Sequence, residues 1–126
     1  MKVEKYFNKL NKLNELIISD KLEIDYLEQL SKFSNDNEIK LKIEQTEDLI
    51  CDEMEEYIKL LRNVRNIINK IEDVDEKLVL KYRYILHYPL RQISDKMKFS
   101  SRQMGRIHIS ALKHADEILK DSGVNA

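Results

Sequence analysis

Apolar residues recur every three or four positions along the first half of the chain, which is the spacing of one face of an α-helix. Between Val3 and Phe33 this series consists of Val3, Tyr6, Leu10, Leu13, Ile17, Ile24 and Leu27, with Asp20 as its one polar break. Between about Asn37 and Asp73 it consists of Ile43, Ile50, Met54, Tyr57, Leu61, Val64, Ile68 and Ile71, with Glu47 at its one charged position. The two series predict two long amphipathic helices.

Residues 34–37 separate these helices with residue types that favour turns and helix N-caps, and we expect Asn37 to cap the second helix. A connection this short joins antiparallel helices. Residues 1–73 are therefore predicted to form a coiled-coil-like helical hairpin. Six apolar residues lie off its two seams: Leu16, Ile18, Leu49, Ile58, Leu60 and Ile67. We expect them to support oligomerisation, as a homodimer; the alternative is a monomeric hairpin packed against the C-terminal domain.

After residues 72–75 shorter apolar clusters replace the long series. Leu78, Val79, Tyr82 and Ile85 share one face of a helix over residues 75–86, which Asp73 or Asp75 can cap and Tyr88-Pro89 ends. Residues 89–97 and 101–119 form two more predicted helices, joined by Lys98-Phe99-Ser100, with six apolar residues turned inward: Ile93, Met97, Met104, Ile107, Ala111 and Leu112. Two helices joined by about three residues behind a supporting helix predict a helix-turn-helix over residues 90–112, in a domain covering 74–126.

The exposed start of the last helix carries the candidate DNA-reading residues. With Met104 and Ile107 inward, the outward positions are Ser101, Arg102, Gln103, Gly105 and Arg106. The start of a recognition helix enters the major groove, where arginine bonds guanine and glutamine bonds adenine through two hydrogen bonds. Gly105 lets the backbone approach DNA closely. Candidates for phosphate contacts are Arg91, Lys96, Lys98, Ser100 and Lys113, and Ser100 is also expected to cap the helix.

The net charge of −1 conceals an asymmetry between the two halves of the chain. Residues 1–73 carry 12 basic and 17 acidic side chains, whereas residues 74–126 carry 10 basic and 6 acidic ones. A polyanion such as double-stranded DNA would therefore meet the C-terminal part. No apolar run has the length of a membrane span or signal peptide, and the single cysteine, Cys51, fits a reducing compartment, so a cytoplasmic location is expected.

No residue pattern indicates catalysis. His87, His108 and His114 lack cysteines or carboxylates at metal-ligand spacing, and the glutamates at 53, 55 and 56 fit a solvated helix face. There is no glycine loop for phosphate. We expect no enzymatic activity, metal, cofactor or small-molecule substrate. Tyr82, Tyr84 and Tyr88 are expected in the core and its rim rather than as platforms for bases.

Three segments, residues 75–85, 90–97 and 99–108, together with Ala111-Leu112, resemble region 4 of sigma-70 factors. They are closer still to a family of small phage and prophage proteins from Gram-positive bacteria, and more loosely similar to the ArpU and RinA phage late-gene regulators. The resemblance covers nearly the whole chain and is specific over residues 75–112. It implies a DNA-binding module with Ser101, Arg102 and Arg106 reading the groove and Ile93 and Met104 in the core.

Three residues depart from the pattern of these relatives. Lys98 stands where the turn usually has glycine, Ser94 replaces a small alanine, and Gly105 replaces a larger residue. The function expected from the sequence is DNA-binding transcription regulation in a phage or mobile element of a bacterial host. The alternatives are a sigma-like protein that binds RNA polymerase or another regulator, and a small terminase subunit.

Overall fold

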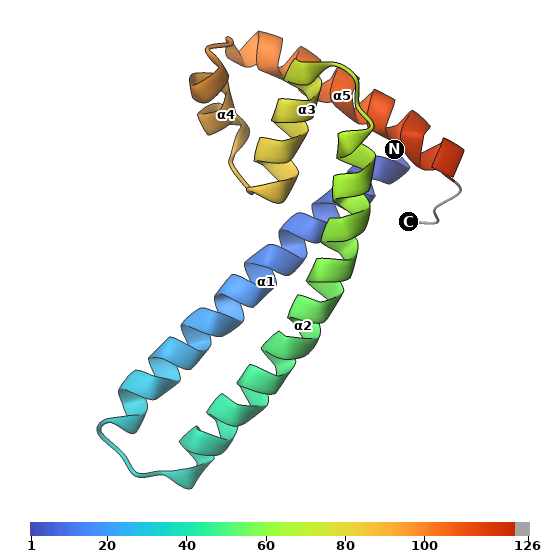
Figure 1. The fold of residues 1–126 in the computed structure, drawn as a ribbon. Coiled ribbons are helices and arrows are strands. Elements are labelled where there is room, and N and C mark those ends of the chain that lie inside the picture. The colour runs from blue at the N-terminus through green and yellow to red at the C-terminus, as the bar shows by residue number, and fades with distance from the viewer. Residues whose placement is uncertain (123–126) are drawn as a thin grey trace. The chain divides into compact units, whose positions relative to one another are not determined.

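The computed structural model describes residues 1–122, and every regular element in that range is a helix (Figure 1). The elements are α1 (Lys2–Ser31), α2 (Asn37–Asn69), α3 (Val74–Leu80), the π-helical turn η1 (Lys81–Ile85), α4 (Leu90–Met97) and α5 (Ser101–Ser122). The long helices α1 and α2 pack antiparallel and shorter helices follow, which confirms the predicted all-α fold. Among the described helices, none is both long and apolar enough to cross a membrane.

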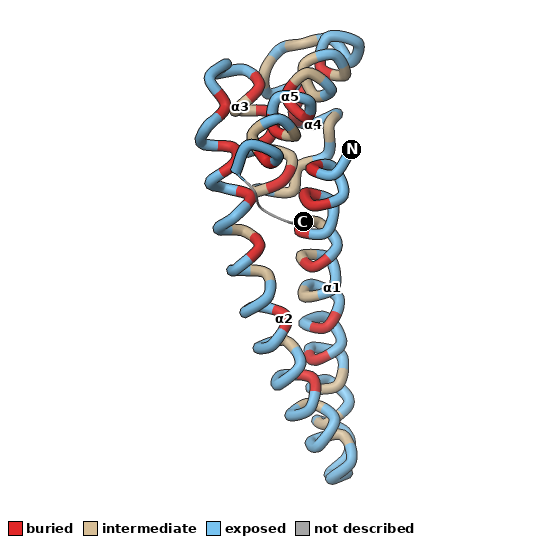
Figure 2. Tube along the Cα trace, turned by 90° about the vertical axis from the view of Figure 1, so that its right-hand side faces the viewer, coloured by how far each residue is buried: buried red, intermediate tan, exposed pale blue. Residues whose placement is uncertain are grey.

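The buried face of α1 is the one that the apolar spacing predicts. Its residues are buried or half-buried at every expected position: Val3, Tyr6, Leu10, Leu13, Ile17, Ile24 and Leu27. Figure 2 shows buried residues along the sides of α1 and α2 that face each other. Asp20 is buried as well, so the seam of the hairpin includes the polar break.

The buried face of α2 confirms every predicted apolar position except Met54, and it also includes residues that were not predicted. Its buried and half-buried residues are Ile39, Ile43, Thr46, Ile50, Glu53, Tyr57, Leu60, Leu61, Val64, Ile67 and Ile68, and Ile71 is buried just after the helix. The predicted Met54 is 46% exposed, and its neighbour Glu53 takes the place in the seam. Thr46 likewise lies in the seam in place of Glu47. The prediction was wrong at these positions because it did not identify Thr46 and Glu53 as seam residues. Thr46 Oγ1 donates to the carbonyl of Lys42 in α2 itself, whereas Glu53 has a partner across the hairpin.

That partner is Asp20. Asp20 and Glu53 are each 8% exposed and lie together between α1 and α2. Burial, a hydrogen bond with Asp20 and the negative charge of Asp20 raise the pKa of Glu53 to about 7, because two adjacent carboxyl groups resist double ionisation. Asp20 Oδ2 and Glu53 Oε1 have no hydrogen-bond partner within residues 1–122. The seam therefore contains a protonatable acid pair.

The turn between α1 and α2 lies where the sequence predicts it, but its cap is one residue earlier. Asp36 Oδ1 accepts a hydrogen bond from the backbone N–H of Glu38 at 2.9 Å, and Asn37 is already the first helical residue. Asp36 therefore caps α2, in place of the predicted Asn37.

The chain forms two compact units. Residues Lys12–Lys59 make one, and Met1–Asn11 together with the chain from Leu60 onward make the other. Within the second unit the backbone N–H of Val3 donates to Asp116 Oδ1 of α5 at 3.1 Å, and the rings of Phe7 and Tyr84 are 4.9 Å apart. The base of the hairpin thus shares a core with the C-terminal helices. The predicted division of function at residues 73 and 74 stays a prediction.

Candidate nucleic-acid interface

The helix before the helix-turn-helix begins as predicted and ends differently. Asp73 accepts a hydrogen bond from the backbone N–H of Glu76 at 2.9 Å and so caps α3. The predicted single helix to Leu86 instead changes to the π-helical turn η1. The chain then leaves the helix through His87, which has a positive φ of 62°, and Pro89 precedes the first residue of α4.

Three buried side chains from three helices form the centre of the module: Val79 of α3, Ile93 of α4 and Met104 of α5. Six partly buried side chains surround them: Tyr82, Tyr88, Leu90, Met97, Phe99 and Ile107. The core positions predicted for Ile93 and Met104 are confirmed, and Phe99 of the connection also packs against this core. Tyr82 and Tyr88 stack at 5.8 Å within the rim, where the sequence placed them.

The turn between α4 and α5 has the geometry of a helix C-cap. Lys98 adopts the left-handed conformation, with φ 58° and ψ 38°, and its backbone N–H donates to the carbonyl of Ser94. The N–H of Phe99 donates to the same carbonyl at 3.1 Å. A side chain at this φ costs about 1–2 kcal/mol. Lys98 therefore occupies a strained turn position at which glycine would be unstrained.

Ser100 and Gln103 form a capping box at the start of α5. Ser100 Oγ accepts from the backbone N–H of Gln103 at 3.1 Å, and Gln103 Oε1 accepts from the backbone N–H of Ser100 at 3.0 Å. The cap predicted for Ser100 is confirmed. The part that Gln103 takes in the cap was not predicted, although the Ser-x-x-Gln spacing is a recognised signal for a capping box. An adenine contact through both amide atoms would require Gln103 to leave the cap.

One face of α5 presents basic side chains to solvent. Arg102, Arg106 and Lys113 are exposed and lie in one row, because residues four and eleven apart share a helix face. Within residues 1–122 none of the three forms a hydrogen bond or an ion pair. Ile109 lies between Arg106 and Lys113 in the same row and is 53% exposed. The sequence reading missed Ile109, whose apolar side chain suits contact with a thymine methyl group.

The other candidate contacts also lie at the surface. Ser101, Arg91, Lys96 and Ser100 are exposed, and Lys96 Nζ lies 5.5 Å from the centre of the Tyr88 ring. Residues 90–113 carry six basic side chains and one acidic one. The excess of basic over acidic side chains per residue is larger here than over residues 74–126 as a whole, and it favours binding of a polyanion.

Gly105 lies in the first turns of α5, half-buried. A Cβ added at this position would meet no atom within 4 Å. Packing within the described residues therefore does not require glycine here, although glycine in a helix costs about 1 kcal/mol relative to alanine.

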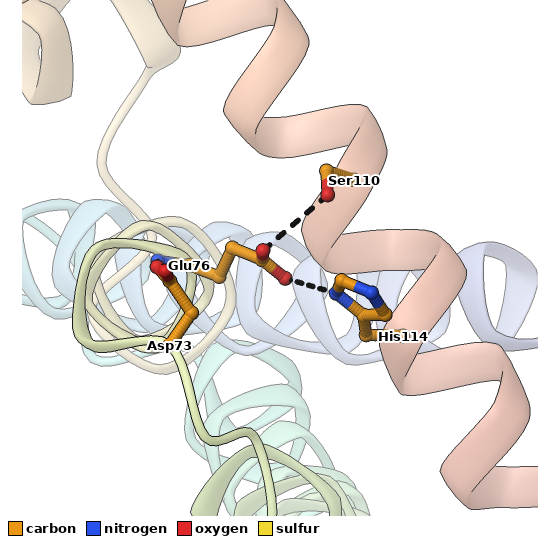
Figure 3. Close-up of polar contacts among 4 residues, drawn as sticks. All are labelled: Asp73, Glu76, Ser110 and His114. Atoms are coloured by element: carbon orange, nitrogen blue, oxygen red, sulfur yellow. Dashed lines mark hydrogen bonds and ion pairs between the residues drawn. The ribbon is translucent and has the colours of Figure 1, made fainter.

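A polar clamp holds α3 against α5. Figure 3 shows the Glu76 carboxylate between Ser110 and His114, which project from successive turns of α5. Ser110 Oγ donates to Glu76 Oε2 at 3.3 Å, and His114 Nδ1 lies 2.5 Å from Glu76 Oε1. The hydrogen bond and the negative charge of Glu76 raise the pKa of His114. The clamp fixes the orientation of α5 relative to the supporting helix.

A second polar contact joins α5 to η1. Tyr84 Oη and His108 Nε2 are 2.8 Å apart, and burial raises the pKa of Tyr84 to about 12 and lowers that of His108. His87 in turn contacts Asn11 Oδ1 through Nδ1. Each of the three histidines thus has a protein partner. Within the described residues, no three His, Cys, Asp or Glu side chains come together as a metal site.

The family described as "Protein of unknown function (DUF1492)" matches residues 16–116. The chain belongs to this family. The match to DUF1492 includes α3, η1, α4 and the part of α5 that carries the basic row and the clamp. No curated protein and no solved structure matches the chain.

Proposed function

We propose that this member of DUF1492 is a DNA-binding transcription regulator of a phage or mobile element, acting as a homodimer in the cytoplasm of a bacterial host. The observation that supports it best is the row of Arg102, Arg106 and Lys113 on α5, exposed and unpaired within the described residues. Arginines near the start of a recognition helix are suited to guanine O6 and N7 in the major groove.

The surroundings of this row fit the same role. Arg91, Lys96 and Lys98 add positive charge from α4 and the turn, where they are suited to contact phosphates and fix the register on DNA. Gly105 has no side chain that would hold the backbone of α5 away from DNA between Arg102 and Arg106. The capping box leaves Gln103 a structural role, so the proposal assigns base reading to Ser101, Arg102 and Arg106.

The test is selection of bound duplexes from a random pool at two salt concentrations. We expect an enriched sequence, and Arg102→Ala and Arg106→Ala should each weaken binding to it by about 1–3 kcal/mol, or roughly 5- to 150-fold. The matched control is Arg65→Ala, which removes an exposed arginine of α2 outside the module and should leave binding unchanged.

Two results would contradict the proposal. One is selection without any enriched sequence at either salt concentration. The other is equal loss of binding in Arg65→Ala and Arg106→Ala. Retention of RNA polymerase by the immobilised protein, without binding to any duplex, would favour the sigma-like alternative, and rings of eight or more subunits would favour a small terminase subunit.

A further inference from the structure

The hairpin unit, residues 12–59, has a second apolar row besides its seam. Ile18, Leu22, Tyr26 and Leu30 follow one another four residues apart on the side of α1 that is turned away from the seam, and Phe33 continues the row into the turn. Their side chains are between 39% and 91% exposed. This row makes α1 apolar on two opposite sides, although only one side is covered in the hairpin.

A row of this size differs from scattered exposed apolar residues, which are normal on protein surfaces. Aromatic side chains each cover about 150–250 Å² when buried, and the exposed parts of these five residues amount to roughly 500 Å². That is the size of patch that marks a contact surface on a small protein. Two such rows in contact would bury about 1,000 Å², which reaches the lower limit for a specific interface.

The distribution of charge indicates which surface can cover the row. In this unit, residues 37–59 of α2 carry three basic and eight acidic side chains. Residues 12–33 carry three basic and five acidic ones, and one of the five, Asp20, is buried. A basic partner would be attracted to α2 rather than to the row on α1. A second copy that meets α1 through its own α1 leaves both acidic α2 helices on the outside, where they repel each other least.

The spacing of the row fits pairing with itself. Side chains four residues apart form a ridge inclined to the helix axis, and two such ridges interlock when the helices cross at about −50°. In a two-fold dimer the same patch serves both partners, so the middle of the ridge meets its own copy. Tyr26 is the side chain nearest to that middle.

We propose that two copies of this protein associate by crossing their α1 helices through Ile18, Leu22, Tyr26, Leu30 and Phe33. The inference makes specific the self-association in the proposed function and does not depend on DNA binding. It also differs from the surface that the sequence suggested, because Leu60 and Ile67 are buried in the fold and Leu22, Tyr26, Leu30 and Phe33 were not among the residues expected to associate.

The test is sedimentation equilibrium of the full chain at micromolar to submillimolar concentrations. Wild-type protein should be a dimer at tens of micromolar, and Tyr26→Lys should weaken association about 100-fold or more, because two charges would be buried at the crossing. Leu41→Lys is the matched control: it places the same charge on an exposed apolar residue of α2 and should leave the dimer intact. Circular dichroism should show equal helicity in all three proteins.

A second measurement places the crossing point. In a Cys51→Ser background, Tyr26→Cys should be joined into covalent dimers by a short bifunctional thiol reagent, whereas Leu41→Cys should not. A wild-type monomer at all concentrations would overturn the proposal, and so would a Tyr26→Lys protein that dimerises as wild type does. If wild type dimerises through Tyr26 but selects no DNA sequence, this inference stands and the DNA-binding proposal fails.

Discussion

Replacing Lys98 with glycine should stabilise the protein and weaken its binding to DNA. The left-handed backbone at φ 58° costs a lysine about 1–2 kcal/mol that glycine does not incur. Glycine also gives the unfolded chain more conformational freedom, which lowers the free energy of unfolding by about 0.4–1 kcal/mol. The free energy of unfolding should therefore rise by about 0.5–1 kcal/mol, which corresponds to roughly 2–4 °C in Tm for a protein of this size.

Lys98→Ala is the control, because it removes the same charge but keeps a Cβ at the strained position. Urea unfolding followed by circular dichroism should show Lys98→Gly as more stable than wild type and Lys98→Ala as no more stable. On DNA the two variants should behave alike. Each loses one phosphate contact, so the slope of log affinity against log salt should become shallower by about one.

Equal stability of the glycine and alanine variants would refute the claim that position 98 is strained. Unchanged salt dependence in both variants would refute the phosphate contact but leave the strain argument intact. The two readouts thus separate what Lys98 does in the fold from what it does on DNA.

The described contacts predict the behaviour of three further variants. Gly105→Ala should raise the free energy of unfolding by about 1 kcal/mol in urea, yet weaken DNA binding measured by fluorescence anisotropy; unchanged affinity would show that the backbone there does not approach DNA. The pKa of His114 is raised by Glu76, so the clamp contributes fully below pH 6.5 and is lost as pH rises through the folded value; across that interval Tm should fall more in wild type than in His114→Ala. The pKa of Glu53 rises from 4.5 to about 7, so wild type should lose stability as pH rises between those values, and the double variant Asp20→Leu with Glu53→Leu should lose less. The double variant should also be more stable at pH 7, by only about 1–2 kcal/mol because water lies close to a hairpin of two helices, and a less stable double variant would refute this.

Much of the fold follows from spacing alone. The seam of α1 could be predicted position by position, because its apolar residues keep the helical spacing and each is buried or half-buried. The helix-turn-helix core could be predicted for a similar reason: Ile93, Met104 and Phe99 are large apolar residues separated by recognisable turn and cap signals.

The errors have a common physical cause. At Glu53 and Thr46 the structure keeps the helical repeat and accepts polar side chains in the seam, since Asp20 pairs with Glu53 and Thr46 Oγ1 donates to the carbonyl of Lys42 at 2.8 Å. A residue type alone reveals neither a partner on another helix, such as Asp20, nor a hydrogen bond to the backbone of the same helix. The turn η1 and the positive φ of His87 were also missed; there Tyr84 contacts Phe7 and His87 contacts Asn11, residues far away in the sequence.

Two residues of the helix-turn-helix are unfavourable for the local backbone, and no contact among the described residues explains them. A glycine at Lys98 would relax the turn, and an alanine at Gly105 would fit without contact and strengthen the helix. Both lie within four residues of Ser101, where α5 begins its exposed basic row. Sequences break local rules most often where function requires it. A positive side chain at the turn and a missing side chain on the helix suit the close approach to a phosphate backbone that the proposed function requires, and stability alone favours neither.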